Sequence, residues 1–149
     1  MFFYRLKNGI SALLATLFAC VFCFCITSGN VCKLSKIEGK RTFYLDSASS
    51  QSLRKSVLEF TDFFRVKGES VRFDLHEISR NVQMLAREIA ESYHAEILFV
   101  EETGGTLSFY CYTPWLYQGV CVQGKTVNLH IAVSQTQCAV GSPIIFDGF

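Results

Sequence analysis

Apolar residues dominate the start of the chain. Arg5 and Lys7 precede an uncharged stretch over residues 8–32, and the centre of this stretch, residues 10–26, is almost entirely apolar. At about 1.5 Å of rise per residue, a helix over that centre spans roughly 25 Å. Such a segment is typical of an export signal or a membrane anchor, so we expect the rest of the chain to lie outside the cytoplasm.

Three fates stay open for this leader, residues 1–29. It can be retained as an anchor, cut by a signal peptidase near Thr27-Ser28-Gly29, or acylated at Cys20 as in a lipoprotein. The first two products are a membrane-anchored domain and a secreted one. We expect residues 30–40 to form a tether and residues 41–149 to form a single domain, which is enough chain for one core.

Two later segments repeat their apolar residues at helical spacing. The first predicts a short helix over residues 50–64, with its stripe at Leu53, Val57, Phe60 and Phe64. The second predicts a helix over residues 75–93 that packs one face on a sheet, with its stripe at Ile78, Val82, Leu85, Ile89 and Tyr93. Asp74 and Glu77 resemble a capping box at its start.

Short β-rich segments separated by turn residues predict strands. They cover residues 41–46, 70–74, 96–101, 107–113, 119–122, 126–134 and 138–146. Pro143 predicts that part of the last strand lies at a sheet edge. Helices followed by a run of strands indicate an α+β fold. We expect an antiparallel sheet of about 5–6 strands, ending in a C-terminal meander, to pack on two helices as a two-layer sandwich.

The charge balance bears on the class of partner. The whole chain has 14 basic and 13 acidic residues; without Arg5 and Lys7 the basic residues number 12, so the exported part carries a net charge of −1. Nucleic-acid binding usually needs a basic surplus, so we predict no nucleic-acid partner. The three histidines are scattered and no metal-ligand spacing occurs outside the leader, so we expect no metal and no cofactor.

Four cysteines lie beyond the leader, at positions 32, 111, 121 and 138. A hairpin centred on Leu116 would place Cys111 opposite Cys121, at a separation that suits a disulfide. The alternative is that both are buried, reduced thiols. Outside the cytoplasm either state is allowed.

The C-terminal half resembles the YwmB family, which comprises small exported proteins of spore-forming Gram-positive bacteria. The similar segments are Tyr112-Thr113-Pro114, then Val127-Asn128-Leu129-His130-Ile131-Ala132-Val133, then Val140-Gly141-Ser142-Pro143-Ile144-Ile145. The resemblance implies an exported protein with a fold like that of the TATA-box-binding protein, a curved antiparallel sheet backed by helices. It implies no established biochemical activity.

Candidate catalytic groups are sparse. A hydrolase would use a serine from the 47–50 segment or a cysteine such as Cys121, activated by a histidine. No nucleophile-elbow motif surrounds these serines, which fit helix capping equally well. Glu101 and Glu102 are adjacent on a predicted strand and should point to opposite faces, so they cannot act on one substrate together.

Aromatic residues gather in a region without charged neighbours. Tyr110, Tyr112, Trp115 and Tyr117 lie within residues 103–124, and His130 occupies the polar side of the strand 126–134. Tyrosine and tryptophan suit interfaces because they combine a large contact area with a polar tip. We therefore expect a non-catalytic binding module at the cell envelope, with a protein as the first expected partner and a glycan as the second. Closure of the core by these rings is the alternative interpretation, and a small envelope hydrolase is the alternative function.

Overall fold

The computed structural model describes residues 2–29, 31–47, 52–75 and 81–146 of the 149-residue chain. The chain divides into two compact units, Met1–Cys32 and Lys33–Phe149.

The first unit is built on one helix, α1 (Phe2–Gly29), which covers 28 residues. Large apolar side chains along it, including Leu13, Leu17 and Phe18, are exposed. None of the helices in the part of the chain that the structure describes is both long and apolar enough to cross a membrane.

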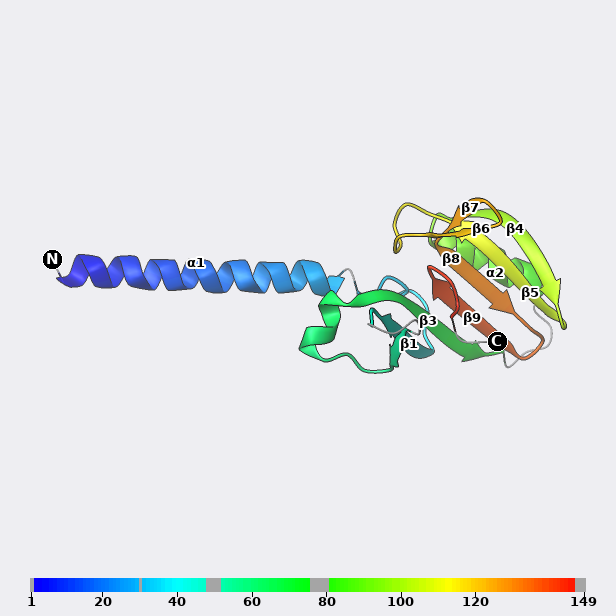
Figure 1. Ribbon diagram of the computed structural model, residues 1–149, viewed down its shortest axis with the longest axis horizontal. Coiled ribbons are helices and arrows are strands. Elements are labelled where there is room, and N and C mark those ends of the chain that lie inside the picture. The colour runs from blue at the N-terminus through cyan, green and yellow to red at the C-terminus, as the bar shows by residue number, and fades with distance from the viewer. Residues whose placement is uncertain (1, 30, 48–51, 76–80, 147–149) are drawn as a thin grey trace. The chain divides into compact units, whose positions relative to one another are not determined.

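The second unit is built on an open antiparallel sheet, whose strand order is β2-β1-β3-β9-β8-β5-β4 (Figure 1). The seven strands are β1 (Lys40–Leu45), β2 (Leu53–Lys55), β3 (Val66–Asp74), β4 (Glu96–Thr103), β5 (Thr106–Tyr112), β8 (Leu129–Val133) and β9 (Gln137–Ser142). The predicted α+β class with a large antiparallel sheet is confirmed. The sheet is wider than the expected 5–6 strands because β2, where no strand was predicted, joins it at one edge.

One face of this sheet packs against helix α2 (Val82–Ser92) (Figure 1). The helix starts at Asn81, whose side chain accepts a hydrogen bond from the backbone of Gln83 at 3.0 Å. It buries a stripe made of Leu85, Ala86, Ile89 and Ala90. The predicted helix over residues 75–93 is thus confirmed in its second part only. Its expected first turn, with Glu77 and Ile78, lies outside the described residues.

The predicted helix over residues 50–64 is wrong where the structure describes it. The strand β2 occupies Leu53–Lys55 and pairs with β1, and a short 3-10 helix, η1, occupies Phe60–Phe64. The four apolar residues that suggested a helix are all exposed, so they form no packing stripe: Leu53, Val57, Phe60 and Phe64. Two helices packed on one sheet were expected, but in the described residues α2 is the α-helix that does so.

The C-terminal strands run as a meander with one excursion. β4, β5, β8 and β9 pair in that order, as the predicted meander requires. Between β5 and β8 the chain leaves the sheet and forms a two-stranded hairpin from β6 (Val120–Val122) and β7 (Lys125–Val127). The single strand predicted over residues 126–134 is therefore split at Asn128. β9 lies inside the sheet, between β3 and β8, and ends before Pro143, so the predicted edge position is wrong.

Part of the segment expected to be a tether contributes to the folded unit. Leu34 is fully buried in the core, and its backbone N–H donates to the Glu69 carboxylate at 2.7 Å. The Arg41 guanidinium donates to the carbonyls of Leu34 and Ile37, at 3.1 and 3.3 Å. These bonds hold residues 34–37 against β1 and β3, so ordered packing begins before residue 41.

Candidate functional site

Three rings form a row across the sheet face opposite α2. Phe99 on β4 is paired with Tyr110 on β5, and Tyr110 is paired with His130 on β8. The Phe99 and Tyr110 ring centroids are 4.5 Å apart at 17°, and those of Tyr110 and His130 are 4.5 Å apart at 8°. Directly opposed residues on one face of an antiparallel pair lie close enough to stack in this way. The register of β4, β5 and β8 therefore places these three rings next to one another.

His130 is a neutral packing group in this row. Burial lowers its pKa from 6.5 to about 4, so the ring is uncharged near neutral pH. Its Nδ1 accepts a hydrogen bond from the backbone N–H of Ile145 at 3.4 Å, while its Nε2 is buried and has no hydrogen-bond partner among the described residues. His130, which the sequence predicts as a binding residue, thus contacts the C-terminal segment through its Nδ1.

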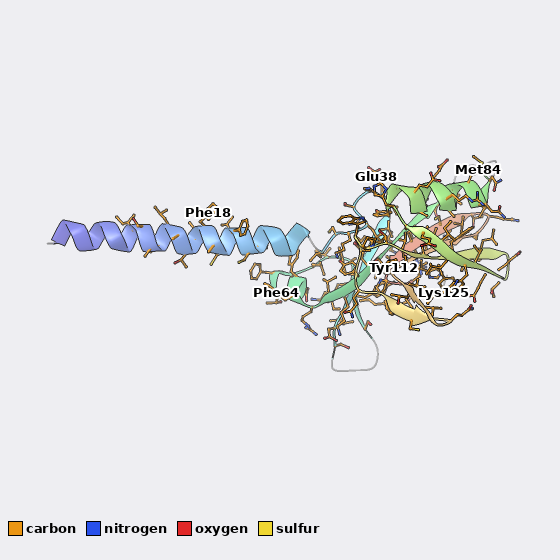
Figure 2. The ribbon with its side chains drawn as sticks, turned by 90° about the horizontal axis from the view of Figure 1, so that it is seen from above. Phe18, Glu38, Phe64, Met84, Tyr112 and Lys125 are labelled. Carbon is orange, nitrogen blue, oxygen red and sulfur yellow. The ribbon has the colours of Figure 1, made fainter. Side chains whose placement is uncertain are left out.

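The β6–β7 hairpin covers the Phe99 end of the row. Figure 2 shows Met84 of α2 and Lys125 of β7 on opposite sides of the sheet. The Lys125 Nζ lies 5.7 Å from the centroid of the Phe99 ring and donates to the Leu98 carbonyl at 3.0 Å. Gln123 at the hairpin tip donates to the Glu101 carboxylate at 2.5 Å. Burial, and then the hydrogen bond to Glu101, raise the pKa of Tyr110.

The loop that follows β5 is held from below by Asn128. The Asn128 amide oxygen accepts from the Thr113 N–H at 2.8 Å, and its NH₂ group donates to the carbonyls of Thr113 and Tyr117, at 2.5 and 3.3 Å. The Thr113 hydroxyl donates to the carbonyl of Tyr93 at 2.9 Å. Leu116 is buried in the core under α2. The start of this loop is thus fixed to Tyr93, at the C-cap of α2, and to Asn128, the residue before β8.

Two aromatic side chains of the same region are left in solvent. Trp115 is 71% exposed and Tyr112 is 41% exposed. Tyr117 is half-buried, and the Lys33 Nζ lies 5.0 Å from its ring centroid. The five predicted binding residues therefore separate. Tyr110 and His130 stack inside the row, Tyr117 packs beside Lys33, and Tyr112 and Trp115 remain open to a partner.

The proposed opposition of Cys111 and Cys121 is wrong. Cys111 on β5 is paired with Ile97 and Leu129, whereas Cys121 on β6 is paired with Thr126. Both are free thiols, with Cys111 buried and Cys121 exposed. The expected hairpin does not form because β5 pairs with β4 and β8, whereas β6 pairs with β7.

The surroundings of the buried thiols do not activate them. Burial raises the pKa of Cys111 and that of Cys138 to about 12, so both remain protonated. Ser47 lines a hollow beside Asp46. Ser49, Ser50 and His76 lie outside the described residues.

The acidic pair at the end of β4 is divided between the two sheet faces. Glu101 is paired with Ser108, and Glu102 with Leu107 on the α2 side. The expectation that these carboxylates point apart agrees with this register. Among the described residues, no group of three histidine, cysteine, aspartate or glutamate side chains is placed to hold a metal ion.

Sequence reasoning missed three groups that shape this half of the molecule: Phe99, Asn128 and the fully buried Glu69. Phe99 has no signal in the alternation, which would place it on the face of Ile97, because the register of β4 shifts between Ile97 and Phe99 and sets Phe99 opposite Tyr110. Asn128 has a weak signal, because it is a single amide side chain between two apolar residues, Val127 and Leu129, and all three are buried. Glu69 has none in its own segment, because its partners Leu34 and Arg41 lie far away in the sequence.

Comparison with known proteins adds no relative. No protein-family model matches the chain, and no curated protein or solved structure is significantly similar to it.

Proposed function

We propose that this chain is an exported or membrane-tethered protein whose folded unit acts as a non-catalytic binding module at the cell envelope. Its binding surface is the aromatic loop, residues 112–117, with Tyr112 and Trp115 as the contacting side chains. The apolar leader supports the location, and the exposed rings support the mode of action.

The observation that carries the proposal is the exposure of Trp115 on an anchored loop. Tryptophan is among the residues that contribute most to binding when buried by a partner. Here it is 71% exposed. The loop under it is fixed by Asn128, Thr113 and the buried Leu116, so little further ordering is needed on binding. A preorganised, exposed tryptophan is a feature of binding surfaces.

A protein is the expected partner class. Exposed rings on a loop suit the surface of a second macromolecule, whereas small ligands are usually enclosed in concave pockets. No charged residue lies between Glu102 and Lys125, so the loop offers apolar contact and hydrogen bonding from Tyr112. A glycan of the envelope is the second class, since sugars also stack on exposed rings.

Site-specific crosslinking in intact cells tests the proposal. A photoreactive amino acid replaces Gln118, which is exposed beside the aromatic loop, in the full-length chain. We expect discrete crosslinked species, and we expect a Tyr112→Ala, Trp115→Ala double variant to lose them. The same photoreactive residue at Met84, exposed on α2, is the matched control and should give none of these species.

The single tryptophan supplies a direct readout for the glycan arm. Soluble peptidoglycan fragments added to the purified full-length chain should shift Trp115 emission if they bind at the loop. A double variant that folds like the wild type and keeps every crosslink would contradict the proposed surface. Recovery of the intact chain from cytosol alone would contradict the proposed location.

A further inference from the structure

A second exposed apolar surface lies on the segment between β2 and β3. Val57 is 76% exposed, Phe60 is 63% exposed and Phe64 is 70% exposed. The rings of Phe60 and Phe64 meet edge to face, with centroids 6.1 Å apart at 78°. We call these three residues the phenylalanine wedge. Large apolar groups gathered at one exposed place mark an interaction site far more often than scattered ones do.

The wedge is presented by a turn that polar groups hold in shape. Asp62, in the middle of η1, is buried, accepts from the Glu59 N–H at 2.9 Å and pairs with the Lys55 Nζ at 2.8 Å. Asp62 and Glu59 form a capping box across the start of η1. The polar residue of this turn therefore points inward and the two rings point outward. Solvation alone would favour the opposite arrangement, with the carboxylate exposed and the rings buried.

The charges around the wedge are mostly paired within the protein. Lys55 is neutralised by Asp62, and the Lys67 Nζ lies 3.0 Å from Asp46 Oδ1. The Arg65 guanidinium donates to the backbone carbonyl of Asp46 at 2.5 Å, so it keeps its net charge. Arg54 and Glu59 are also exposed, and the Glu59 carboxylate lies 3.8 Å from the Lys55 Nζ, so the rim of the wedge keeps a small net positive charge. A cationic rim around exposed aromatic residues suits an interface that is apolar inside and anionic or zwitterionic at its surface.

A hollow adjoins the wedge on the side of the cationic residues. It has a volume of about 510 Å³ and is lined by Asp46, Ser47, Phe64, Arg65, Val66 and Lys67. The same ring, Phe64, thus belongs to both the wedge and the hollow. Arg65, whose charge no carboxylate of the described residues pairs, can contact a phosphate group beside this hollow while the neighbouring rings enter an apolar layer.

We propose that the phenylalanine wedge inserts into the interfacial layer of a lipid bilayer, with Arg65 at the level of the lipid phosphates. The sequence adds an independent reason for this occupant, since an apolar leader ends only a few residues before the folded unit begins. A tether of that length keeps the unit at high effective concentration near any membrane that holds the leader. The proposal rests on the membrane-proximal location proposed above and not on the aromatic loop.

Depth-dependent fluorescence quenching tests the proposal on the full-length chain. Trp115→Phe removes the single tryptophan, and Phe60→Trp or Phe64→Trp then places a new one in the wedge. Met84→Trp in the same background is the matched control, because Met84 is 59% exposed on α2. The proteins are reconstituted with vesicles of phosphatidylcholine and phosphatidylglycerol containing brominated acyl chains. We expect blue-shifted, strongly quenched emission from both wedge tryptophans and unshifted, weakly quenched emission from the control.

Flotation of the vesicles separates the two proposals. If the chain does not float with vesicles, the membrane-proximal location is wrong and the wedge proposal fails with it. If the chain floats but the wedge tryptophans respond like the Met84→Trp control, the wedge proposal alone is overturned. A blue shift that appears without lipid and grows with protein concentration would assign the wedge to a second copy of the chain, and would also overturn it.

Discussion

Asn128 bonds to the backbone of Thr113 as a neighbouring strand would. Its amide oxygen accepts from the Thr113 N–H, and its amide nitrogen donates to the Thr113 carbonyl. The last ladder pair below it joins Cys111 to Leu129. The side chain thus extends the pairing by one more residue after β5 has ended. The Asn128 side chain therefore fixes the backbone at the start of the aromatic loop.

Replacement of Asn128 by alanine is expected to lower the free energy of unfolding by about 2–4 kcal/mol, because it leaves buried backbone donors and acceptors without partners. Urea denaturation of the full-length chain measures this loss. Asn81→Ala is the matched control, since Asn81 makes a single exposed capping bond to Gln83 and should cost about 1 kcal/mol. Equal losses from the two substitutions would show that Asn128 does not hold the loop. Faster amide hydrogen exchange over residues 113–117 in Asn128→Ala would support that it does.

The His130 ring should make stability depend on pH below neutrality. Its pKa is about 4 in the folded protein and 6.5 when unperturbed, so the unfolded chain takes up the proton first as the pH falls. The stability due to the neutral ring is complete above pH 6.5 and is lost between pH 6.5 and 4. The loss amounts to about 3 kcal/mol.

His130→Phe keeps a ring against Tyr110 and removes the titrating group, so the variant should not show the loss between pH 6.5 and 4 and should gain about 3 kcal/mol relative to the wild type over that range. Urea denaturation at several pH values between 4 and 7 measures this. His94→Asn is the control, because His94 is exposed and asparagine tolerates its positive φ of 50°. A wild-type pH dependence retained in His130→Phe would refute the assignment to this ring.

The sequence predicts helices and strands correctly where the buried residues recur with the periodicity of a helix or a strand. The alternation over residues 107–113 and 126–134 indicates the central strands β5 and β8, because every second side chain there faces the α2 layer. The stripe of α2 is found for the same reason. The helix expected over residues 50–64 fails because its apolar residues repeat at the right spacing without being buried. Spacing carries information about structure only when one face is removed from water.

The site depends more on pairing than on composition. The sequence places Tyr110, Tyr112, Trp115 and Tyr117 near one another, but it does not say which rings stack and which remain exposed. That division is set by the register that opposes Tyr110 to Phe99 and His130. The Cys111 and Cys121 hypothesis fails on the same ground. The hypothesis assumes that two strands close in the sequence form a hairpin. Instead β5 pairs with β8, which follows the β6–β7 hairpin in the sequence.

Burial raises the pKa of Glu69 above its ordinary value of 4.5, against the hydrogen bond from Leu34 and the nearby Arg41. The folded protein therefore holds this proton more tightly than the unfolded chain does. As far as this group is concerned, stability is greatest below pH 4.5 and decreases as the pH rises from there through the folded pKa.

Glu69→Gln should abolish that decrease and change stability at neutral pH by no more than about 1 kcal/mol, since an amide oxygen can still accept from the Leu34 N–H. Glu69→Ala should cost about 2–3 kcal/mol, because it leaves that buried donor unpaired. Thermal unfolding of the three proteins across the acidic range measures both effects. A Glu69→Gln variant as unstable as Glu69→Ala would mean that the charge itself stabilises the fold.

Thiol labelling tests the pairing of β5 and β6 directly. Cys121 is exposed and should react with a maleimide in the native, full-length chain under non-reducing conditions. Cys111 and Cys138 are buried, and their pKa values of about 12 leave almost no thiolate, so they should react only as fast as the protein unfolds.

Peptide mass spectrometry assigns the label to each cysteine, and denaturant supplies the control in which all of them must react. Raising the urea concentration should accelerate labelling of Cys111 and Cys138 together, since both belong to the one core under α2. Labelling of Cys121 should not change. Protection of Cys121 in the native chain, or its recovery in a peptide linked to Cys111, would mean that the loop between them folds back as a hairpin. The clamp by Asn128 and the exposed position of Trp115 would then both be wrong.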